Sequence, residues 1–157
     1  MESTSSLPLQ GLRVLEIGDN AQVCGKVLAC LGADVIKIES PVGSLKRNEY
    51  PFVSGKDGTK ESLAFFYFNV NKRSITLSLD KESDLLAFKE LVRQADVVLD
   101  GMEAEEVNKL GLDYPSLKTL NPRLVVTSVS GFGRFGPYSH FRAPDIVCQA
   151  MSGHSVL

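Results

Sequence analysis

The sequence predicts an α/β fold in which a Rossmann-like parallel sheet carries helices on both faces. Short apolar, β-branched runs alternate along the chain with stretches of helical apolar spacing, and turns of a few residues separate many of them. The apolar runs are nearly continuous, which is typical of parallel strands covered on both sides. With 157 residues, of which 43% are hydrophobic, the chain is long enough for one domain with a core.

The first three elements predict a compact βαβ unit. The run LRVLEIG at 12–18 reads as a buried strand, and DVIKIE at 34–39 reads as a second one. Between them, Val23, Val27, Leu28 and Leu31 share a helical face. Asn20 is placed to cap this helix, and Gly32 fits the left-handed position after its end. A right-handed crossover between parallel strands is the expected connection.

The rest of the chain continues the alternation. Residues 40–60 are rich in Gly, Pro, Lys and Ser and predict a long loop. The expected helices cover 61–69, 81–94, 103–111 and 114–121, and a last one begins near residue 145. Asp80 is the expected cap of the helix at 81–94, and Asp145 that of the last helix. The expected strands are 73–79, 96–100 and 123–129.

Composition excludes several classes of function. A net charge of −2 argues against a nucleic-acid surface, and no apolar run approaches a membrane span. The two histidines lack ligand-spaced partners, so we expect no metal site. Residues 1–8 lack the features of a signal peptide and predict a disordered tail before a domain at 9–157. Three cysteines without a C-x-x-C pair indicate a reducing, cytoplasmic setting.

Ligands of open parallel sheets bind outside the carboxyl ends of the strands. The segments to consider there are 18–22, 39–47, 79–81, 100–103 and 130–136. Asp19 is either a helix cap or a ligand-binding group, and Glu39 is either a ribose-binding acid or a structural carboxylate. The adjacent cations Lys72 and Arg73 either hold phosphate, are solvated, or fix the chain by hydrogen bonds.

The stretch VSGFGRFGPYS contains Gly131, Gly133 and Gly136, which is a literal G-x-G-x-x-G. A dinucleotide fingerprint needs a helix directly after these glycines, but Pro137 follows and 138–144 shows no helical period. The loop therefore predicts another role. Cys148 reads as a core residue, because no base for a nucleophilic cysteine is evident in the sequence.

Six stretches in order resemble family III CoA-transferases, which include formyl-CoA and carnitine CoA-transferases and α-methylacyl-CoA racemase. They are PLQGLRVLEIG, LGADVIKIESPVG, FNVNKRSITLSL, ADVVLDG, LGLDYPSLKTLNPRLVVTSVSGFGRFGPYS and APDIVCQAMSG. The resemblance runs from about Pro8 to the last residue and concerns the N-terminal part of the family. It implies that coenzyme A or an acyl-CoA is a substrate, with a carboxylic acid as the other.

The resemblance also implies a ligand site. Gly131, Phe132 and Gly133 would line the channel for the pantetheine and thioester end of CoA, because glycine lets backbone approach a ligand closely. Carried over position by position, the CoA-contacting residues are Ala21, Leu77, Gly101, Met102, Lys109, Ser130, Gly131, Phe132 and Gly133. Transfer in the family runs through an aspartate nucleophile. That aspartate is expected beyond the motif matched by Gln149, Ala150, Ser152 and Gly153, so no catalytic residue is expected in this chain.

Asp145 matches a different family position and is not the nucleophile. The family's second domain is expected to be missing too, so the chain alone should not turn over, and the full-length parent is expected to be an interlocked homodimer. The racemase branch places a histidine where Pro144 stands, which favours a transferase over a racemase or lyase.

The sequence departs from the family after the first strand, where NAQVCG lacks a proline, and after the fourth, where GMEAEE replaces N-F-R-P-G. Glu103, Glu105 and Glu106 would oppose a phosphate-rich ligand, and Lys109 stands for an arginine. These changes support an alternative, a non-catalytic CoA-binding or dimer-scaffolding half of a tandem protein.

Overall fold

The computed structural model describes residues 7–55 and 58–154. Its main sheet has five parallel strands in the order β5-β2-β1-β6-β7. The strands are β1 (Arg13–Gly18), β2 (Asp34–Glu39), β5 (Arg73–Thr76), β6 (Val97–Gly101) and β7 (Val125–Ser128). The chain moves to one side of β1 for β2 and β5, and to the other for β6 and β7. The order therefore reverses between β1 and β6, where such folds open a crevice for ligands.

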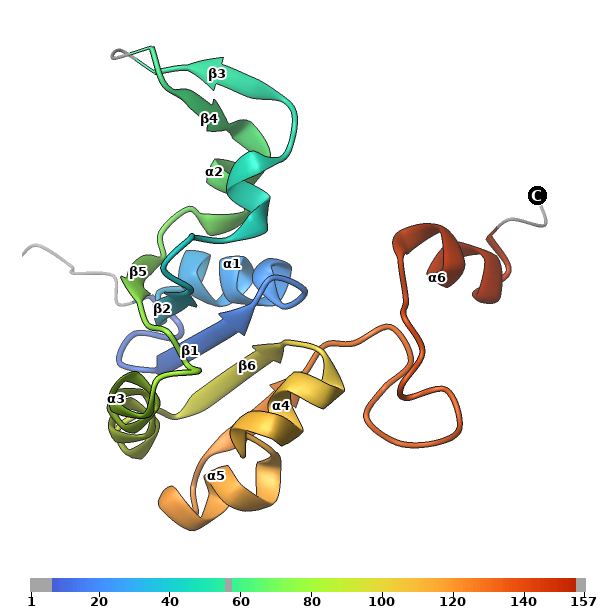
Figure 1. The fold of residues 1–157 in the computed structure, drawn as a ribbon. Coiled ribbons are helices and arrows are strands. Elements are labelled where there is room, and N and C mark those ends of the chain that lie inside the picture. Colours follow the sequence, from blue (N-terminus) through green and yellow to red (C-terminus); the bar gives the residue numbers. More distant parts are fainter. Residues whose placement is uncertain (1–6, 56–57, 155–157) are drawn as a thin grey trace, which may run out of the picture.

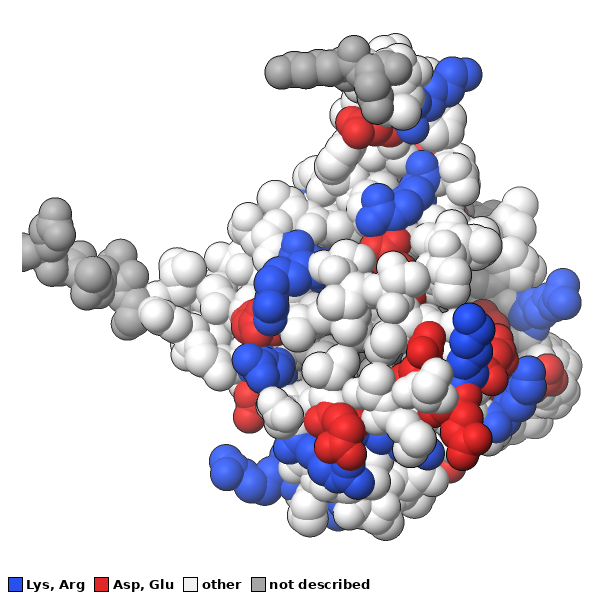
Figure 2. Space-filling view, turned by 60° about the vertical axis from the view of Figure 1, so that its left-hand side comes forward, with Lys and Arg blue, Asp and Glu red and all other residues white. Residues whose placement is uncertain are grey.

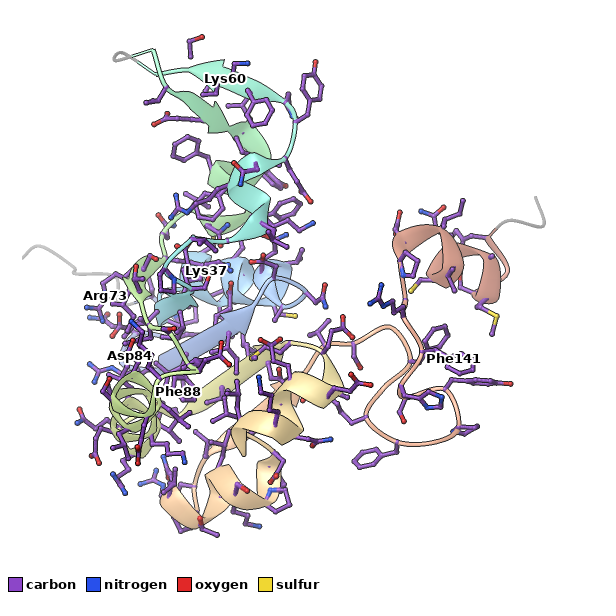
Figure 3. The ribbon with its side chains drawn as sticks, in the orientation of Figure 1. Lys37, Lys60, Arg73, Asp84, Phe88 and Phe141 are labelled. Carbon is purple, nitrogen blue, oxygen red and sulfur yellow. The ribbon has the colours of Figure 1, made fainter. Side chains whose placement is uncertain are left out.

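Helices cover both faces of this sheet, as the sequence predicted (Figure 1). The helix α1 (Gln22–Cys30) packs Ala29 against Val14, Val35 and Leu99 on one face. On the other lie α3 (Glu82–Arg93), α4 (Ala104–Leu110) and α5 (Tyr114–Leu120). Their buried residues Phe88, Val92, Val107 and Leu117 join Leu15, Ile17, Ile36 and Val98 in the larger core. Figure 3 shows Phe88 of α3 directed toward the strands.

The predicted long loop at 40–60 is wrong in part. It contains a short 3-10 helix, η1 (Leu45–Asn48), and an antiparallel hairpin of β3 (Phe52–Ser54) and β4 (Lys60–Ser62). The helix α2 (Leu63–Asn69) follows, and the Ser62 hydroxyl accepts a hydrogen bond from the Phe65 amide at 3.1 Å. This cap explains why the helix begins at Leu63 rather than at residue 61. The hairpin and α2 project from the sheet (Figure 1).

The end of the described chain stands apart from the sheet. After β7, a loop leads to α6 (Asp145–Met151), which has no buried residue and lies away from the strands (Figure 1). Phe132, Tyr138 and Phe141 pack against one another within the loop. Figure 3 shows Phe141 on this loop, away from the sheet.

Three predicted helix caps are wrong. Ala21 rather than Asn20 occupies the cap position of α1, and Lys81 rather than Asp80 that of α3. Asp80 is 78% exposed and approaches Lys109, while Asp84 in the first turn accepts from the Ser78 amide at 2.8 Å. Pro144 precedes α6, so Asp145 is its first residue, and its carboxylate accepts from the Gln149 side chain at 2.7 Å.

The helix ends fit the predictions better. Gly32 has φ +102° after α1, and Gly111 ends α4 in the left-handed conformation.

At the start of the chain, residues 1–6 of the predicted tail lie outside the described residues. Leu7 belongs to a turn in which its carbonyl accepts from the Gln10 amide at 3.0 Å.

Candidate functional site

Two glycines bring the ends of β1 and β6 into direct contact. Gly18 pairs with Gly101 in the sheet register and has φ +72°. A Cβ on Gly18 would lie 2.5 Å from the carbonyl carbon of Gly101, and one on Gly101 would lie 2.6 Å from the Ala21 nitrogen. Both contacts are with backbone, which cannot move aside. Glycine at these two positions therefore allows close backbone contact between the ends of β1 and β6, at the point where the strand order reverses.

A first cleft of about 420 Å³ opens above this contact. Its walls come from the carboxyl ends of β1, β2 and β6 and from the segment after β5. Three of the predicted CoA-contacting residues line it: Leu77, Gly101 and Met102. The location is the one expected for a ligand of an open parallel sheet.

The first cleft is acidic. Asp19, Asp80, Glu103 and Glu106 all line it. Partial desolvation, and then the nearby Asp80 carboxylate, raise the pKa of Glu106 above its usual value, with Lys109 opposing. Asp80 and Lys109 approach each other at 3.4 Å, and both are largely exposed. Lys109 does not line this cleft or the two described below.

Glu39 has a structural role. Its carboxylate accepts two hydrogen bonds from the Arg47 guanidinium, at 2.7 and 2.8 Å, and others from the Ser44 amide and the Ser74 hydroxyl. The arginine contact is the main cause that lowers the pKa of Glu39 to about 2. Both carboxylate oxygens are occupied, so of the two alternatives for Glu39 the structural one holds.

Lys72 has a structural role, whereas Arg73 is largely exposed at the surface. The buried Lys72 ammonium donates to Glu16 at 2.7 Å, to the Gln22 carbonyl and to Asn69, while Arg73 pairs with Asp34. Burial is the main cause that lowers the pKa of Lys72, and the Glu16 carboxylate opposes it. Gly25 makes room for this cluster, because a Cβ there would lie 1.7 Å from a Glu16 oxygen.

Asp19 joins the same cluster instead of capping α1. Its Oδ1 accepts from Lys37 at 3.1 Å and from the Ser44 hydroxyl at 2.7 Å. Lys37 is buried and also donates to Glu16 at 3.0 Å. A buried ammonium needs a carboxylate partner, which explains why Asp19 turns away from the helix. The sequence offers no signal for this pairing, since the partners lie 18 and 21 residues apart.

A second cleft, of about 960 Å³, lies between α4 and the segment after β7. Ser130 and Gly131 line it, together with Lys46, Arg142, His140 and the half-buried Cys148. Asn20 and Glu103 line both the first and the second cleft, so the two adjoin. The Cys148 thiol donates to the Ala143 carbonyl at 3.5 Å.

A third cleft, of about 550 Å³, lies between α4, α5 and β7 and includes Gly133 and Arg134. Arg134 Nη2 donates to Asp100 and, at 2.8 Å, to the Met102 carbonyl. The Asp100 carboxylate also accepts from the Met102 amide at 3.0 Å and from the Ser128 hydroxyl at 2.9 Å. No individual role for Asp100 or Arg134 was predicted from the sequence.

The loop at 130–133 presents free backbone donors. Among the described residues, none of the backbone N–H groups from Ser130 to Gly136 donates a hydrogen bond, and those of Gly131, Phe132 and Gly133 lie within this run. Gly133 has φ +79°, and no atom lies within 4 Å of the position that a Cβ would take there. Gly131 differs, because a Cβ on it would collide with Ala143 at 1.9 Å. Three successive unpaired N–H groups can bind a carbonyl oxygen or an oxyanion.

The predicted contact residues are thus distributed over three adjoining clefts. Ala21 is fully buried, Lys109 is exposed, and Phe132 packs in the loop; these three line none of the clefts. Within residues 7–55 and 58–154, no group of three or more His, Cys, Asp or Glu side chains is arranged to hold a metal ion. Nor does this part of the chain contain a helix with the length and apolar character of a membrane span.

Charge is mixed on the face in Figure 2, where acidic and basic side chains are interspersed among uncharged ones and form no extended basic surface.

A model of CoA-transferase family III matches residues 9–157. The chain belongs to CoA-transferase family III. The sequence-based resemblance is therefore confirmed.

Curated relatives of this family III chain are CoA-transferases. It is 42% identical over 154 residues to succinate–glutarate CoA-transferase of Agrobacterium fabrum, covering 93% of this chain and 38% of that protein. It is 38% identical to formyl-CoA:oxalate CoA-transferase of Streptomyces coelicolor, covering 92% of this chain and 35% of the relative. The chain thus spans little more than a third of the length of these relatives.

A solved structure of a CAIB/BAIF family protein from Brucella suis superposes with a TM-score of 0.87 at 39% identity. It covers 94% of this chain and 40% of that one. The α/β architecture of this family III chain therefore agrees with that of a related protein.

Proposed function

We propose that this chain is the CoA-binding part of a CoA-transferase that moves CoA between an acyl-CoA and a carboxylic acid. The observation that carries the proposal is the run of three unpaired amides at Gly131, Phe132 and Gly133, beside adjoining clefts at the carboxyl ends of the strands. The curated relatives support it, since their names describe CoA transfer.

In the proposed reaction, a carboxylate oxygen of an aspartate attacks the thioester carbon, and the CoA thiolate leaves. The thiolate then attacks the aspartyl carbonyl, which releases the first acid and leaves an aspartyl-CoA thioester. The acceptor carboxylate attacks this thioester and expels the CoA thiolate, which leaves a mixed anhydride of the acceptor and the aspartate. The thiolate then attacks the acceptor carbonyl, which forms the new acyl-CoA and releases the aspartate carboxylate. We assign the nucleophile to no residue of 1–157. The part of this chain is to hold CoA and to donate backbone hydrogen bonds to the oxyanions.

The ligand would extend across the clefts. We propose that the thioester end lies against Gly131–Gly133, and that the nucleotide end lies near Gly101 and Met102 in the first cleft. Lys46 and Arg142 in the second cleft are the cations available to the phosphates. Leu77 and Ser130 would contribute further contacts, whereas Ala21, Lys109 and Phe132 would need rearrangement or an indirect role.

Isothermal titration of the chain with CoA tests the proposal, with NADH as the control ligand. We expect a dissociation constant in the micromolar range for CoA and no heat of binding for NADH, because no helix follows the glycines to receive a pyrophosphate. Absence of CoA binding would remove the proposed ligand site. Tighter binding of NADH would restore the dinucleotide interpretation of the loop.

A scaffolding role is the second candidate. Val23 and Val27 of α1 and Phe66 and Tyr67 of α2 are each more than half exposed on neighbouring helices. Exposed apolar side chains of this kind favour an interface. We propose that they contribute to a homodimer of the longer protein in a reducing, cytoplasmic setting, which agrees with the free Cys24, Cys30 and Cys148. Light scattering after size exclusion, with Phe66→Ser as the variant, tests this dimer.

A further inference from the structure

The pair of Asp100 and Arg134 connects two parts of the chain that the proposed function assigns to one ligand. Asp100 lies near the end of β6, directly before Gly101 and Met102 of the first cleft. Arg134 directly follows the three unpaired amides of the loop after β7. The two residues are 34 positions apart in the sequence, so their contact connects two segments that are distant along the chain.

The contact is built rather than incidental. The Asp100 side chain is 4% exposed and that of Arg134 is 16% exposed. One arginine nitrogen serves two acceptors on the β6 side, the Asp100 carboxylate and the Met102 carbonyl. Asp100 is itself fixed by the Met102 amide and the Ser128 hydroxyl. The hydrogen-bond partners of the pair therefore belong to the ends of β6 and β7, while the other two arginine nitrogens, Nε and Nη1, are buried without a partner among the described residues.

The loop has few other attachments. Gly133 and Gly136 have no atom within 4 Å of a hypothetical Cβ, and Phe135 is 91% exposed. The amides of Gly131, Phe132 and Gly133 are unpaired, as described above. Without Arg134, little within 132–136 would connect the loop to the sheet.

We propose that Arg134, through Asp100, is a positioning residue that holds the Gly131–Gly133 amides at a fixed distance from the end of β6. It acts through the loop and does not itself contact the reacting atoms. This inference rests on the proposed function, since it is the CoA ligand that needs both segments in register. Both hydrogen bonds come from the single nitrogen Nη2, so a lysine would keep the charge and a donor, but its ammonium is more strongly hydrated than a guanidinium and is harder to bury.

Two readouts on the chain test the inference. The variant to use is Asp100→Asn/Arg134→Met, because removal of both charges leaves no buried ion without a partner, so the fold should survive. We expect the backbone ¹⁵N order parameters at Gly131–Gly136 to fall from values typical of rigid backbone to below about 0.6, while those in β1 and α3 are unchanged. We expect the dissociation constant for CoA to rise at least tenfold. The exposed Arg123→Met is the matched control and should change neither.

The single variants Arg134→Met and Asp100→Asn should each weaken CoA binding about as much as the double variant does, because the two residues act as one unit. Arg134→Lys should restore part of the affinity. Unchanged loop order parameters in the double variant would overturn the inference, as would wild-type CoA affinity in it. If the wild-type chain itself binds no CoA, the proposed function fails with that result, and the loop order parameters alone decide whether Arg134 positions the loop.

Discussion

Gly18 and Gly101 are enclosed by backbone, Gly18 by Gly101 of β6 and Gly101 by the turn at 20–21 after β1, whereas Gly133 and Gly136 lie in open space after β7. All but Gly101 have positive φ. The first two are therefore explained by packing inside the fold, while the loop glycines leave the backbone accessible. Glycine therefore permits close contact between backbones in one region and leaves backbone N–H donors accessible to a ligand in the other.

Gly18→Ala should have the largest effect. The new Cβ would meet the Gly101 carbonyl carbon at 2.5 Å and would also be strained at φ +72°. We expect a loss of about 3 kcal/mol or more in the free energy of unfolding. Gly11→Ala is the matched control, because Gly11 has φ +92° with no atom within 4 Å, so only about 1–2 kcal/mol of strain is expected. Urea denaturation measures both, and equal losses would refute the role of backbone contact.

Glu39→Gln tests whether the charged groups beside the enclosed region are structural. Since the folded pKa of Glu39 is about 2 and its ordinary value is 4.5, the carboxylate stabilises the fold above about pH 4.5. That contribution is lost as the pH falls from 4.5 toward 2. We expect the variant to be about 2 kcal/mol less stable at pH 7 and nearly equal to the wild type at pH 2. A difference that does not depend on pH would contradict the assignment.

Gly133→Ala tests the open region. No atom obstructs the new methyl group, so stability should fall only by about 1–2 kcal/mol from the positive φ. If backbone of the loop faces CoA, affinity should fall at least tenfold. Gly136→Ala shares the strain at φ +90° and is the control for stability. Equal CoA affinity in the two variants would place the ligand elsewhere.

Glu106→Gln should have the smallest effect of these variants, and it should raise the affinity for CoA instead of lowering it. Removing one carboxylate from the acidic first cleft should strengthen CoA binding about threefold at low salt, and less at high salt. Titration calorimetry at two salt concentrations measures this. The distant and exposed Glu61→Gln changes net charge equally and should leave affinity unchanged. If Glu106→Gln weakened binding, the carboxylate would be a ligand-binding group.

Much of the fold could be predicted from the sequence because it is encoded locally. The runs at 12–18 and 34–39 are nearly continuously buried, as expected for parallel strands covered on both faces, and the apolar face of α3 repeats with the helical period. The hairpin at 52–62 was missed because its two strands of three residues are too short to show alternation. Asp19 does not cap α1 for another reason: its carboxylate accepts from Lys37, which is 18 positions away in the sequence.

The candidate site divides in the same way. The glycine loop could be recognised as a motif, and its G-x-G-x-x-G could be rejected as a dinucleotide fingerprint from Pro137 alone. The buried pair of Asp100 and Arg134 could not, because nothing in a single sequence connects residues 34 positions apart. Ala21 was assigned by resemblance, but it is fully buried in the smaller core cluster with Val14, Ala29 and Leu99.

The most direct test is to map CoA on the uniformly ¹⁵N-labelled chain by NMR. The account predicts that CoA shifts the amide signals of Gly131, Phe132 and Gly133 together with those of Gly101 and Met102, and leaves those of the hairpin β3–β4 in place. Shifts confined to the hairpin or to α1, with the loop amides unmoved at saturating CoA, would contradict it.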